Sequence, residues 1–359
     1  MFSEKDSAAD RQKQKKTVNS VISLLSAIMV LCGVSTVTVG DAPIVPYKFS
    51  SNLEAEASQI WLPICIPSAG RIPMLTFLPS FRNTNNDSEV SQGQVPENAL
   101  PVLSLTLQPP ASMNGEDGVY INNEANKSIN PSELLGSENT FFLKKDGSVS
   151  VIIYHTHGTE SYNNEGLSYY GDEFYDVHSE DLSQNVVHIG QIITEKLRKS
   201  GIGVVHDTTM YDYEDYNNAY SRSCAGVEAL LDLYPNAKII LDIHRDTIVL
   251  KSGVKYRPVV DYNGKNVAQM MILVGTGKAS APNDHWQENL SMAMKLQREA
   301  ENICENVMRP ILLRNSGYNQ HLSNGSILVE MGTCGNSLKE AELAAEILSK
   351  AIINAFAEK

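Results

Sequence analysis

The second half of the chain alternates short apolar runs with amphipathic segments. The apolar run Ser150–Tyr154 predicts a buried strand, and the segment 183–199 places apolar residues at intervals of three and four, which predicts a helix that stops before Gly201. The same alternation continues to the C-terminus. The further elements predicted in this way are strands at 203–206, 238–243, 254–262, 267–274, 311–314 and 326–330, and helices at 217–233, 285–308 and from Ser337 onward.

Two local motifs sharpen this pattern. The sequence NGKN between 254–262 and 267–274 is typical of a hairpin turn, and Ser337 with Glu340 forms a capping box at the start of the last helix. Strands that alternate with helices indicate an α/β fold with a mainly parallel twisted sheet and helices on both faces. The hairpin adds an antiparallel excursion to that sheet.

The first forty residues have a different pattern. Residues 1–20 carry a cluster of basic side chains, and residues 21–40 carry no charge and are mostly apolar. We expect one transmembrane helix at 21–40 with a cytoplasmic tail at 1–20 and an extracytoplasmic C-terminal domain. A cleaved signal peptide or lipidation at Cys32 are the alternatives, although VTVGDAP is a poor cleavage site and Leu31 precedes the cysteine.

Residues 41–148 contain short apolar patches separated by Pro, Asn and Ser, so we interpret them as a spacer or a small accessory region. We expect residues 149–359 to form the catalytic domain.

The charge balance and the cysteines of the chain exclude two classes of function. The 359 residues contain Lys+Arg 29 and Asp+Glu 42, a formal net charge of −13. This balance argues against nucleic-acid binding, which needs a basic face. The five cysteines match no zinc or redox spacing.

Three predicted strands deliver unusual polar residues at their carboxyl ends. The strand 150–154 leads into HTHGTESY, the strand 238–243 leads into His244-Arg245-Asp246, and the strand 326–330 ends at Glu330. In open α/β sheets, ligands bind beyond the carboxyl ends of the strands. We therefore expect these residues to share one crevice.

The residue types suit catalytic zinc. His157 and Glu160 form an HxxE pattern, and His244 is the natural third ligand, which gives three protein ligands and an open position for water. His155 is an alternative to His157 as ligand, or a substrate contact, or a histidine with a structural role. Glu330 would be the general base, since a carboxylate that ends an apolar strand is costly to leave unpaired.

Two further roles are predicted on the strand that carries His244. Arg245 would hold a substrate carboxylate by a two-pronged contact, and Asp246 would lie by the substrate or orient a ligating imidazole. These residues complete the predicted site.

At these residues the sequence resembles the stage II sporulation protein P family of endospore-forming bacteria. The motifs that carry the resemblance are VIIYHTHGTESY, NVVHIG…GIGVVHD, KIILDIHRD and ILVEMGTCGNSLKEA, over about 200 residues. More distantly, the domain is similar to zinc-dependent N-acetylmuramoyl-L-alanine amidases. Carried over, that resemblance implies His157, His244 and Glu330 in the site, with Glu160 or else Glu180 or Asp181 as the acidic ligand.

The resemblance implies a membrane-anchored zinc peptidoglycan hydrolase that cleaves the N-acetylmuramoyl-L-alanine amide in engulfment, with the peptide cross-link as a second candidate bond. It also implies the intermembrane space of the sporulating cell as location, and a lytic transglycosylase and a membrane scaffold as partners. A metallocarboxypeptidase that trims stem peptides is the alternative enzyme. A wall-binding module without catalysis is the third hypothesis.

Overall fold

A computed structural model of the chain describes residues 99–358, except 112, 114, 139, 164–166, 172–176 and 214. Apart from Val249–Val254, which fall in a second unit, the described residues belong to one compact unit. The predicted tail 1–20 and anchor 21–40 lie outside the described residues. Within the described part of the chain, no helix combines the length and apolar character needed to span a bilayer.

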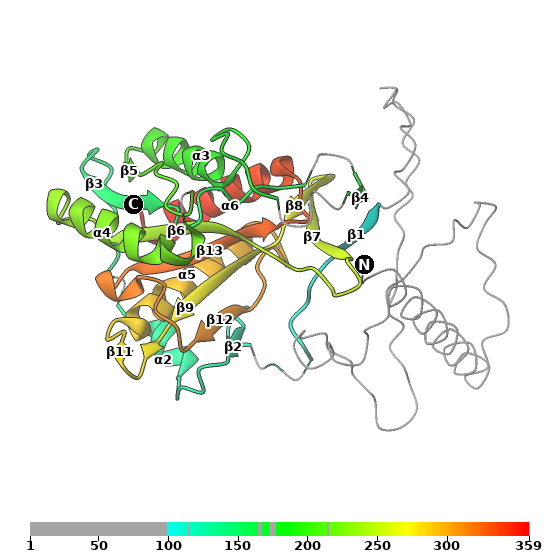
Figure 1. Cartoon of the computed structure of the whole chain (residues 1–359). Helices are drawn as coiled ribbons and strands as arrows, with labels where there is room; N and C mark the ends of the chain where they lie inside the picture. Colours follow the sequence, from blue (N-terminus) through cyan, green and yellow to red (C-terminus); the bar gives the residue numbers. More distant parts are fainter. Residues whose placement is uncertain are drawn as a thin grey trace. The chain divides into compact units, whose positions relative to one another are not determined.

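A seven-stranded sheet forms the middle layer of this unit, in the order β2-β12-β9-β13-β6-β3-β5 (Figure 1). Neighbouring strands are parallel except β9 and β13, which are antiparallel. The mainly parallel sheet predicted from the sequence is therefore confirmed, with one reversal of direction. The strands are β2 (Ile121–Asn123), β3 (Val149–Tyr154), β5 (Gly203–His206), β6 (Ile239–Asp246), β9 (Met270–Gly275), β12 (Ile311–Arg314) and β13 (Ser326–Thr333).

A four-stranded sheet in the order β4-β1-β7-β8 lies beside it, and β10 and β11 form a short ribbon. The predicted hairpin turn is confirmed, because Asn263 and Gly264 take left-handed backbone angles in the tight turn between β7 and β8. The single strand predicted at 267–274 is wrong, since this stretch is divided between β8 in the four-stranded sheet and β9 in the seven-stranded sheet. The bounds are β1 (Leu100–Leu105), β4 (Tyr169–Tyr170), β7 (Lys255–Tyr262), β8 (Lys265–Ala268), β10 (Gly277–Lys278) and β11 (Ala281–Pro282).

The region predicted as a spacer or accessory region contributes to both sheets. β1 pairs with β7, and β2 pairs with the edge strand β12. Helix α2 (Pro131–Gly136) lies in the same region, and its Leu134 and Leu135 pack against the main core. The folded unit therefore begins before residue 149, because strands from this region pair with strands of the C-terminal part.

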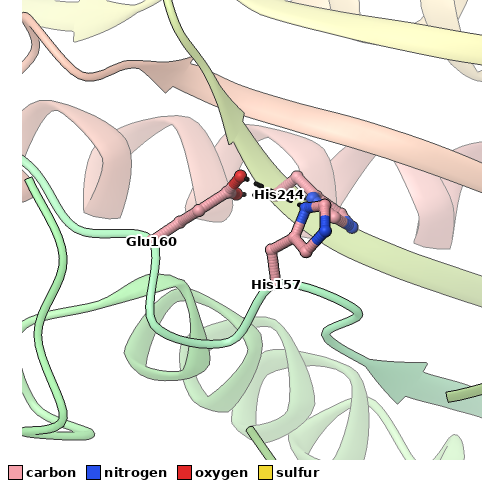
Figure 2. A group of neighbouring side chains, drawn as sticks. All are labelled: His157, Glu160 and His244. Atoms are coloured by element: carbon pink, nitrogen blue, oxygen red, sulfur yellow. Dashed lines mark ion pairs between the residues drawn. The ribbon is translucent and has the colours of Figure 1, made fainter. Parts of the chain in front are cut away.

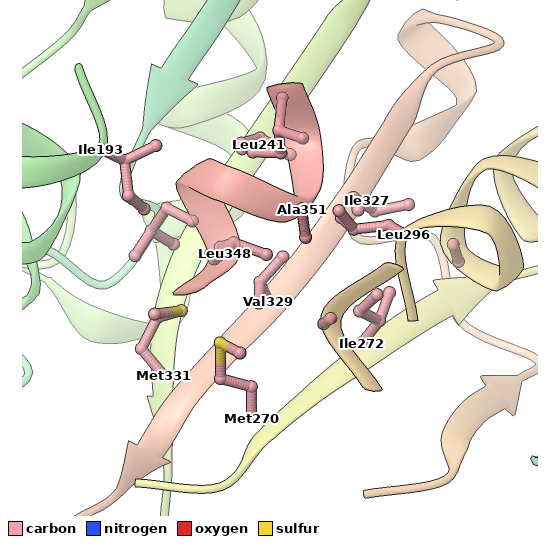
Figure 3. Close-up of a cluster of buried hydrophobic side chains, with 14 of the residues drawn as sticks. Ile193, Leu241, Met270, Ile272, Leu296, Ile327, Val329, Met331, Leu348 and Ala351 are labelled. Atoms are coloured by element: carbon pink, nitrogen blue, oxygen red, sulfur yellow. The ribbon is translucent and has the colours of Figure 1, made fainter. Parts of the chain in front are cut away.

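Four longer helices cover the seven-stranded sheet. α3, α5 and α6 contribute to a large core on one face, and α4 packs on the other face through Val227 (Figures 1 and 3). Residues Ile193, Leu241, Val329 and Leu348 show how helix and sheet side chains meet in the large core. The helix bounds are α3 (Val186–Lys199), α4 (Ala219–Leu233), α5 (Trp286–Ile303) and α6 (Leu338–Phe356), with short 3₁₀ turns at Tyr216–Asn218 and Gln320–Leu322.

The helix ends follow from local chemistry. The capping box of Ser337 and Glu340 is present, and Gly201 follows α3 with a left-handed φ of 87°. α5 ends at Ile303, five residues before the predicted end at 308. The carboxylate of Glu301 accepts the backbone amides of residues 306 and 308, at 2.7 Å each, which turns the chain out of the helix.

Candidate functional site

The site lies where β3, β6 and β13 end. These strands are parallel neighbours, so their carboxyl ends meet at one edge of the sheet. His157 and Glu160 lie in the turn after β3, and His244 lies near the end of β6 (Figure 2). All three are buried, and one ligand atom from each lies within 4.8 Å of the others. The predicted meeting of residues far apart in the chain is confirmed.

Glu160 lies between the two imidazoles. Its Oε1 is 3.6 Å from His157 Nδ1, and its Oε2 is 3.3 Å from His244 Nδ1. The backbone amide of Arg245 also donates to Oε2 at 2.9 Å, which fixes the carboxylate. The other acids considered for this position, Glu180 and Asp181, are exposed. The structure therefore brings Glu160 to the two histidines, as the local HxxE pattern predicts.

Asp242 orients His244 from behind. Its Oδ1 forms an ion pair with His244 Nε2 at 2.9 Å, although the angles do not meet those of a hydrogen bond. The other ring nitrogen of His244, Nδ1, faces Glu160. The amide and hydroxyl of Thr156 donate to Asp242 at 2.8 and 2.7 Å, so the same carboxylate holds the start of the turn. A carboxylate behind a ligating imidazole is the usual outer support of a metal site. Sequence analysis did not select Asp242, although it lies on the same face of β6 as His244.

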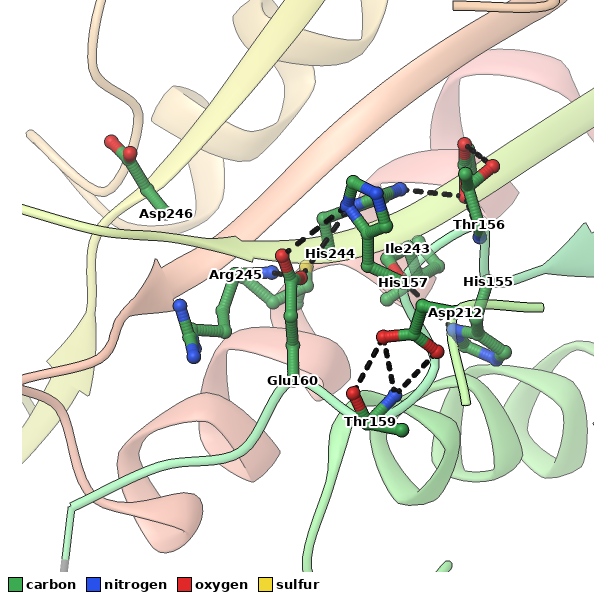
Figure 4. A network of polar contacts seen from close by, with 12 residues as sticks. His155, Thr156, His157, Thr159, Glu160, Asp212, Ile243, His244, Arg245 and Asp246 are labelled. Carbon is green, nitrogen blue, oxygen red and sulfur yellow. Dashed lines mark hydrogen bonds and ion pairs between the residues drawn. The ribbon is translucent and has the colours of Figure 1, made fainter. Parts of the chain in front are cut away.

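A second carboxylate supports the other end of the turn (Figure 4). Asp212 accepts hydrogen bonds from the amide of Thr159, at 3.2 and 3.3 Å, and from its hydroxyl at 2.5 Å. Thr159 lies between His157 and Glu160, so Asp212 fixes the curl that brings those two side chains together. Sequence analysis missed Asp212, because it lies in a loop far along the chain with no motif around it.

The charges at the site are strongly coupled. Burial opposes charge on each group, yet the charge of His244 and its contact with His157 hold the pKa of Glu160 well below the ordinary value. The charges of Asp242 and Glu160 outweigh burial and raise the pKa of His244 well above the ordinary value. Two carboxylates thus converge on one imidazole and favour its positively charged form.

Glu330 lies on β13 directly beside His244 in the parallel register. Its Oε2 is buried and finds no hydrogen-bond partner among the described residues. Burial and the negative charges of Asp246 and Glu160 outweigh the charge of His244 and raise the pKa of Glu330 to about 8. A carboxyl group with such a pKa, next to a candidate metal site, suits a general acid–base role near neutral pH.

Arg245 points away from the cluster (Figure 4). Its guanidinium donates to the carbonyl oxygens of Ser161 and Val177, at 2.8 and 2.7 Å, and to the hydroxyl of Thr247 at 2.6 Å. These contacts hold the loop after the HxxE turn. The structure therefore uses the side chain that we predicted for a substrate carboxylate to fix a loop.

The other two residues predicted to contact substrate also have protein partners. Asp246 accepts from Arg309 Nη1 at 2.7 Å and from the backbone amide of Thr247. His155 Nδ1 lies 2.9 Å from the carbonyl oxygen of Ile243, and its Nε2 lies 2.9 Å from His206 Nε2. The structure brings neither side chain to the cluster of His157, Glu160 and His244.

Two tyrosines flank His157. The ring of Tyr216 stacks on the imidazole with centroids 4.2 Å apart, and the ring of Tyr220 meets it edge-on at 5.4 Å. The imidazole of His244 lies 5.1 Å away at nearly a right angle. These packed rings restrict the rotamer of His157 and hold its Nδ1 toward Glu160.

The residues fit zinc. Two imidazoles and one carboxylate are the donor types of catalytic zinc sites, which combine three protein ligands with an open position. His157, Glu160 and His244 would hold the ion, and Asp242 supplies the outer support. Glu330 has a carboxylate oxygen with no hydrogen-bond partner in the described part of the chain, as a neighbouring base requires.

The family model of stage II sporulation protein P (SpoIIP) matches residues 78–353. This chain belongs to that family. Stage II sporulation protein P of Bacillus subtilis (strain 168) is 28% identical over 206 residues, which cover 54% of this chain and 48% of the relative. The chain thus spans about half the length of that curated relative. Its membership of a sporulation family, predicted from the motifs, is confirmed.

Among solved structures, an N-acetylmuramoyl-L-alanine amidase from Clostridium difficile 630 matches with 15% identity and a TM-score of 0.34, over 58% of this chain and 96% of that one. The CwlD amidase from Clostridioides difficile, solved in complex with the GerS lipoprotein, matches with 18% identity and a TM-score of 0.33, over 56% and 94%. Scores at this level do not establish a shared fold.

Proposed function

We propose that this chain is a zinc-dependent peptidoglycan hydrolase that cleaves the amide between N-acetylmuramic acid and L-alanine. One observation carries the proposal. His157, Glu160 and His244 converge from two strand ends, and Glu330 lies beside them with an unpartnered oxygen and a raised pKa. Membership of a sporulation family is consistent with a cell-wall substrate.

The chain's own residues account for the proton transfers. Zinc, when bound, would polarise a carbonyl and make a water molecule acidic near neutral pH. Glu330 takes the proton of the attacking water and delivers it to the leaving amine nitrogen of alanine. Asp242 and the amide of Arg245 keep His244 and Glu160 in place while this happens. The base must enter the cycle ionised, and the positive charge of a bound ion favours that form.

The contacts of Arg245 favour the amidase over a carboxypeptidase. A carboxypeptidase needs a cation free to bind the terminal carboxylate of its substrate, and Arg245 already donates to Ser161, Val177 and Thr247. Cleavage of peptide cross-links is the second bond included in the proposal. A wall-binding module without catalysis would have no use for the raised pKa of Glu330.

The proposal includes the setting predicted from the sequence. An anchor at 21–40 would hold the domain at the membrane, on the extracytoplasmic side where peptidoglycan lies. In a sporulating cell that side is the intermembrane space, where a lytic transglycosylase and a membrane scaffold would act with it.

The test is digestion of purified sacculi by the full chain and by the His244→Ala variant, with mass spectrometry of the products and zinc analysis of both proteins. We expect the wild type to release whole stem peptides and to contain one zinc per chain. The variant should lose both properties. His188→Ala is the matched control, because His188 pairs with Glu342 on a helix outside the cluster.

The products separate the alternatives. Loss of single terminal residues from stem peptides would replace the amidase by a carboxypeptidase. Binding to sacculi without any product, by a protein that holds no zinc, would replace the enzyme by a binding module.

A further inference from the structure

Hydrolysis of an amide needs more than a base. As water adds to the carbonyl carbon, the carbonyl oxygen becomes an oxyanion, and electrostatic stabilisation of that oxygen is usually a large part of catalysis. The side chains that surround the cluster are mainly acceptors, namely Glu160, Asp242 and Glu330. Arg245 donates to loop oxygens. Beside the polarisation that zinc would supply, the mechanism has so far assigned no hydrogen-bond donor to this oxygen.

Tyr220 is a hydrogen-bond donor beside the cluster. It is in the first turn of α4, and its ring meets the imidazole of His157 edge-on at 5.4 Å. Its backbone carbonyl accepts a hydrogen bond from Asn319 Nδ2 at 2.9 Å, and its ring lies 6.0 Å from that of Tyr318. The start of the helix is thereby tied to the loop before β13, so the phenol has a fixed position beside a candidate zinc ligand.

The phenol is also within electrostatic reach of the acids of the site. Burial raises its pKa far above the ordinary value, and the charges of Asp242, Glu330 and Glu160 raise it further. A phenol with its ordinary pKa of about 10 already keeps its proton throughout the neutral range, so the Tyr220 side chain is a neutral donor there. Among the described residues, its hydroxyl has no hydrogen-bond partner, which leaves it available to a substrate.

We propose that Tyr220 is a further catalytic residue, whose hydroxyl donates a hydrogen bond to the scissile carbonyl oxygen as that oxygen becomes an oxyanion. This inference rests on the proposed amidase function. The O–H bond of Tyr220 stays intact, because Glu330 carries the proton from water to the amine. The donor strengthens its bond as negative charge develops, so it lowers the barrier and adds little to substrate binding.

The test is the Tyr220→Phe variant of the full chain, which keeps the ring that packs on His157 and removes only the hydroxyl. We expect kcat to fall about 100-fold, in line with the loss of one oxyanion donor. KM, zinc content and melting temperature should stay at their wild-type values. Tyr213→Phe is the matched control, because Tyr213 lies in the same tyrosine-rich segment and its side chain is exposed.

A second readout does not depend on turnover. A phosphinate analogue of the muramyl amide carries a charged oxygen where the oxyanion forms, so Tyr220→Phe should weaken its binding by a factor similar to the loss in kcat. Wild-type kcat in Tyr220→Phe would overturn the inference. So would a loss of activity that is matched by a loss of zinc, because Tyr220 would then only support His157. If the wild type itself releases no stem peptides, the proposed function fails first.

Discussion

Two glutamates ten residues apart, the buried Glu340 and the partly buried Glu330, differ in how well they are paired. Glu340, in the first turn of α6, accepts hydrogen bonds from the Arg257 guanidinium, from Asn336 Nδ2 at 3.1 Å and from the amide of Ser337 at 3.0 Å. Glu330, inside β13, has a buried oxygen with no partner among the described residues. Both carboxylates lie on the C-terminal part of one domain.

This difference is the one expected between a structural carboxylate and the catalytic one that we propose. Native proteins pair nearly all buried polar groups, and a fully paired carboxylate such as Glu340 closes a helix end and joins it to β7. An unpaired one destabilises the fold and is retained where chemistry needs a reactive group. We infer that pairing distinguishes the two sites, since Glu340 is buried with partners and Glu330 places a buried Oε2 atom without one among the described residues.

The largest effect should come from Glu330→Gln. The substitution removes the base and keeps the shape, so hydrolysis of sacculi should fall by about 10²–10⁴-fold, the typical contribution of general acid–base catalysis. Stability should not fall, because the neutral amide replaces a carboxylate whose charged form was disfavoured. Muropeptide release, zinc content and thermal unfolding check this result. Near-normal release by a folded, zinc-loaded variant would exclude Glu330 as the base.

The next largest effect should come from Glu340→Gln, which should lower the stability of the protein and leave its activity unchanged. Breaking a buried ion pair leaves the partner charge uncompensated, at a cost of about 3–5 kcal/mol, which is an upper bound here because the Arg257 side chain is 20% exposed. The free energy of unfolding in urea measures this loss. Activity per folded molecule should stay at the wild-type level.

Glu346→Gln is the matched control for Glu340→Gln. Glu346 lies on the same helix and pairs with Lys196 at 2.7 Å, but both side chains are more than 40% exposed. Exposed pairs contribute about 0–1 kcal/mol, so this variant should unfold much like the wild type. An equal loss in both variants would show that helix position, and not buried pairing, determines the cost.

The fold could be predicted largely from the sequence because its signals are local. The strand 203–206 and the strand 311–314 have the predicted bounds, and the capping box of Ser337 marks the start of α6 correctly. The end of α5 could not be predicted, since the contact of Glu301 with two later amides depends on how the chain returns. The pairing of β1 and β2 is equally non-local, because an edge strand accepts a partner from anywhere in the chain.

The site could be predicted only in part, and the residues around His244 show why. Asp242 and Asp246 are both two residues away and lie on the same strand, so spacing alone cannot decide which supports the imidazole. Distant partners decide it. Thr156 holds Asp242 at the turn, whereas Arg309 holds Asp246 elsewhere. Tyr220 lies in none of the motifs that predict the site, and its approach to His157 depends on how α4 packs.

The sequence His155-Thr156-His157 is similarly ambiguous, because either histidine could be the ligand. It leads to the prediction with the smallest expected effect. His157 reaches the cluster, while His155 turns toward His206, with the two Nε2 atoms 2.9 Å apart. Burial lowers the pKa of His155 to about 4 and, together with the charge of His155, that of His206 to about 3. Both histidines are therefore neutral in the folded protein at pH values where an unfolded chain, with histidine pKa near 6.5, takes up protons.

His206→Gln should consequently reduce the acid sensitivity of the fold. Above about pH 6.5 both states are neutral, so the histidine pair contributes no pH dependence. As the pH falls from there to about 4, the unfolded chain gains protons that the folded chain does not, and the free energy of unfolding decreases by at most about 1.4 kcal/mol per pH unit for each histidine. The variant removes one of the two histidines. Its free energy of unfolding, measured in urea, should therefore fall less steeply as the pH is lowered. Measurement at pH 8 isolates the packing effect of the substitution, and an unchanged slope between pH 4 and 6.5 would show that His206 is protonated in the folded state.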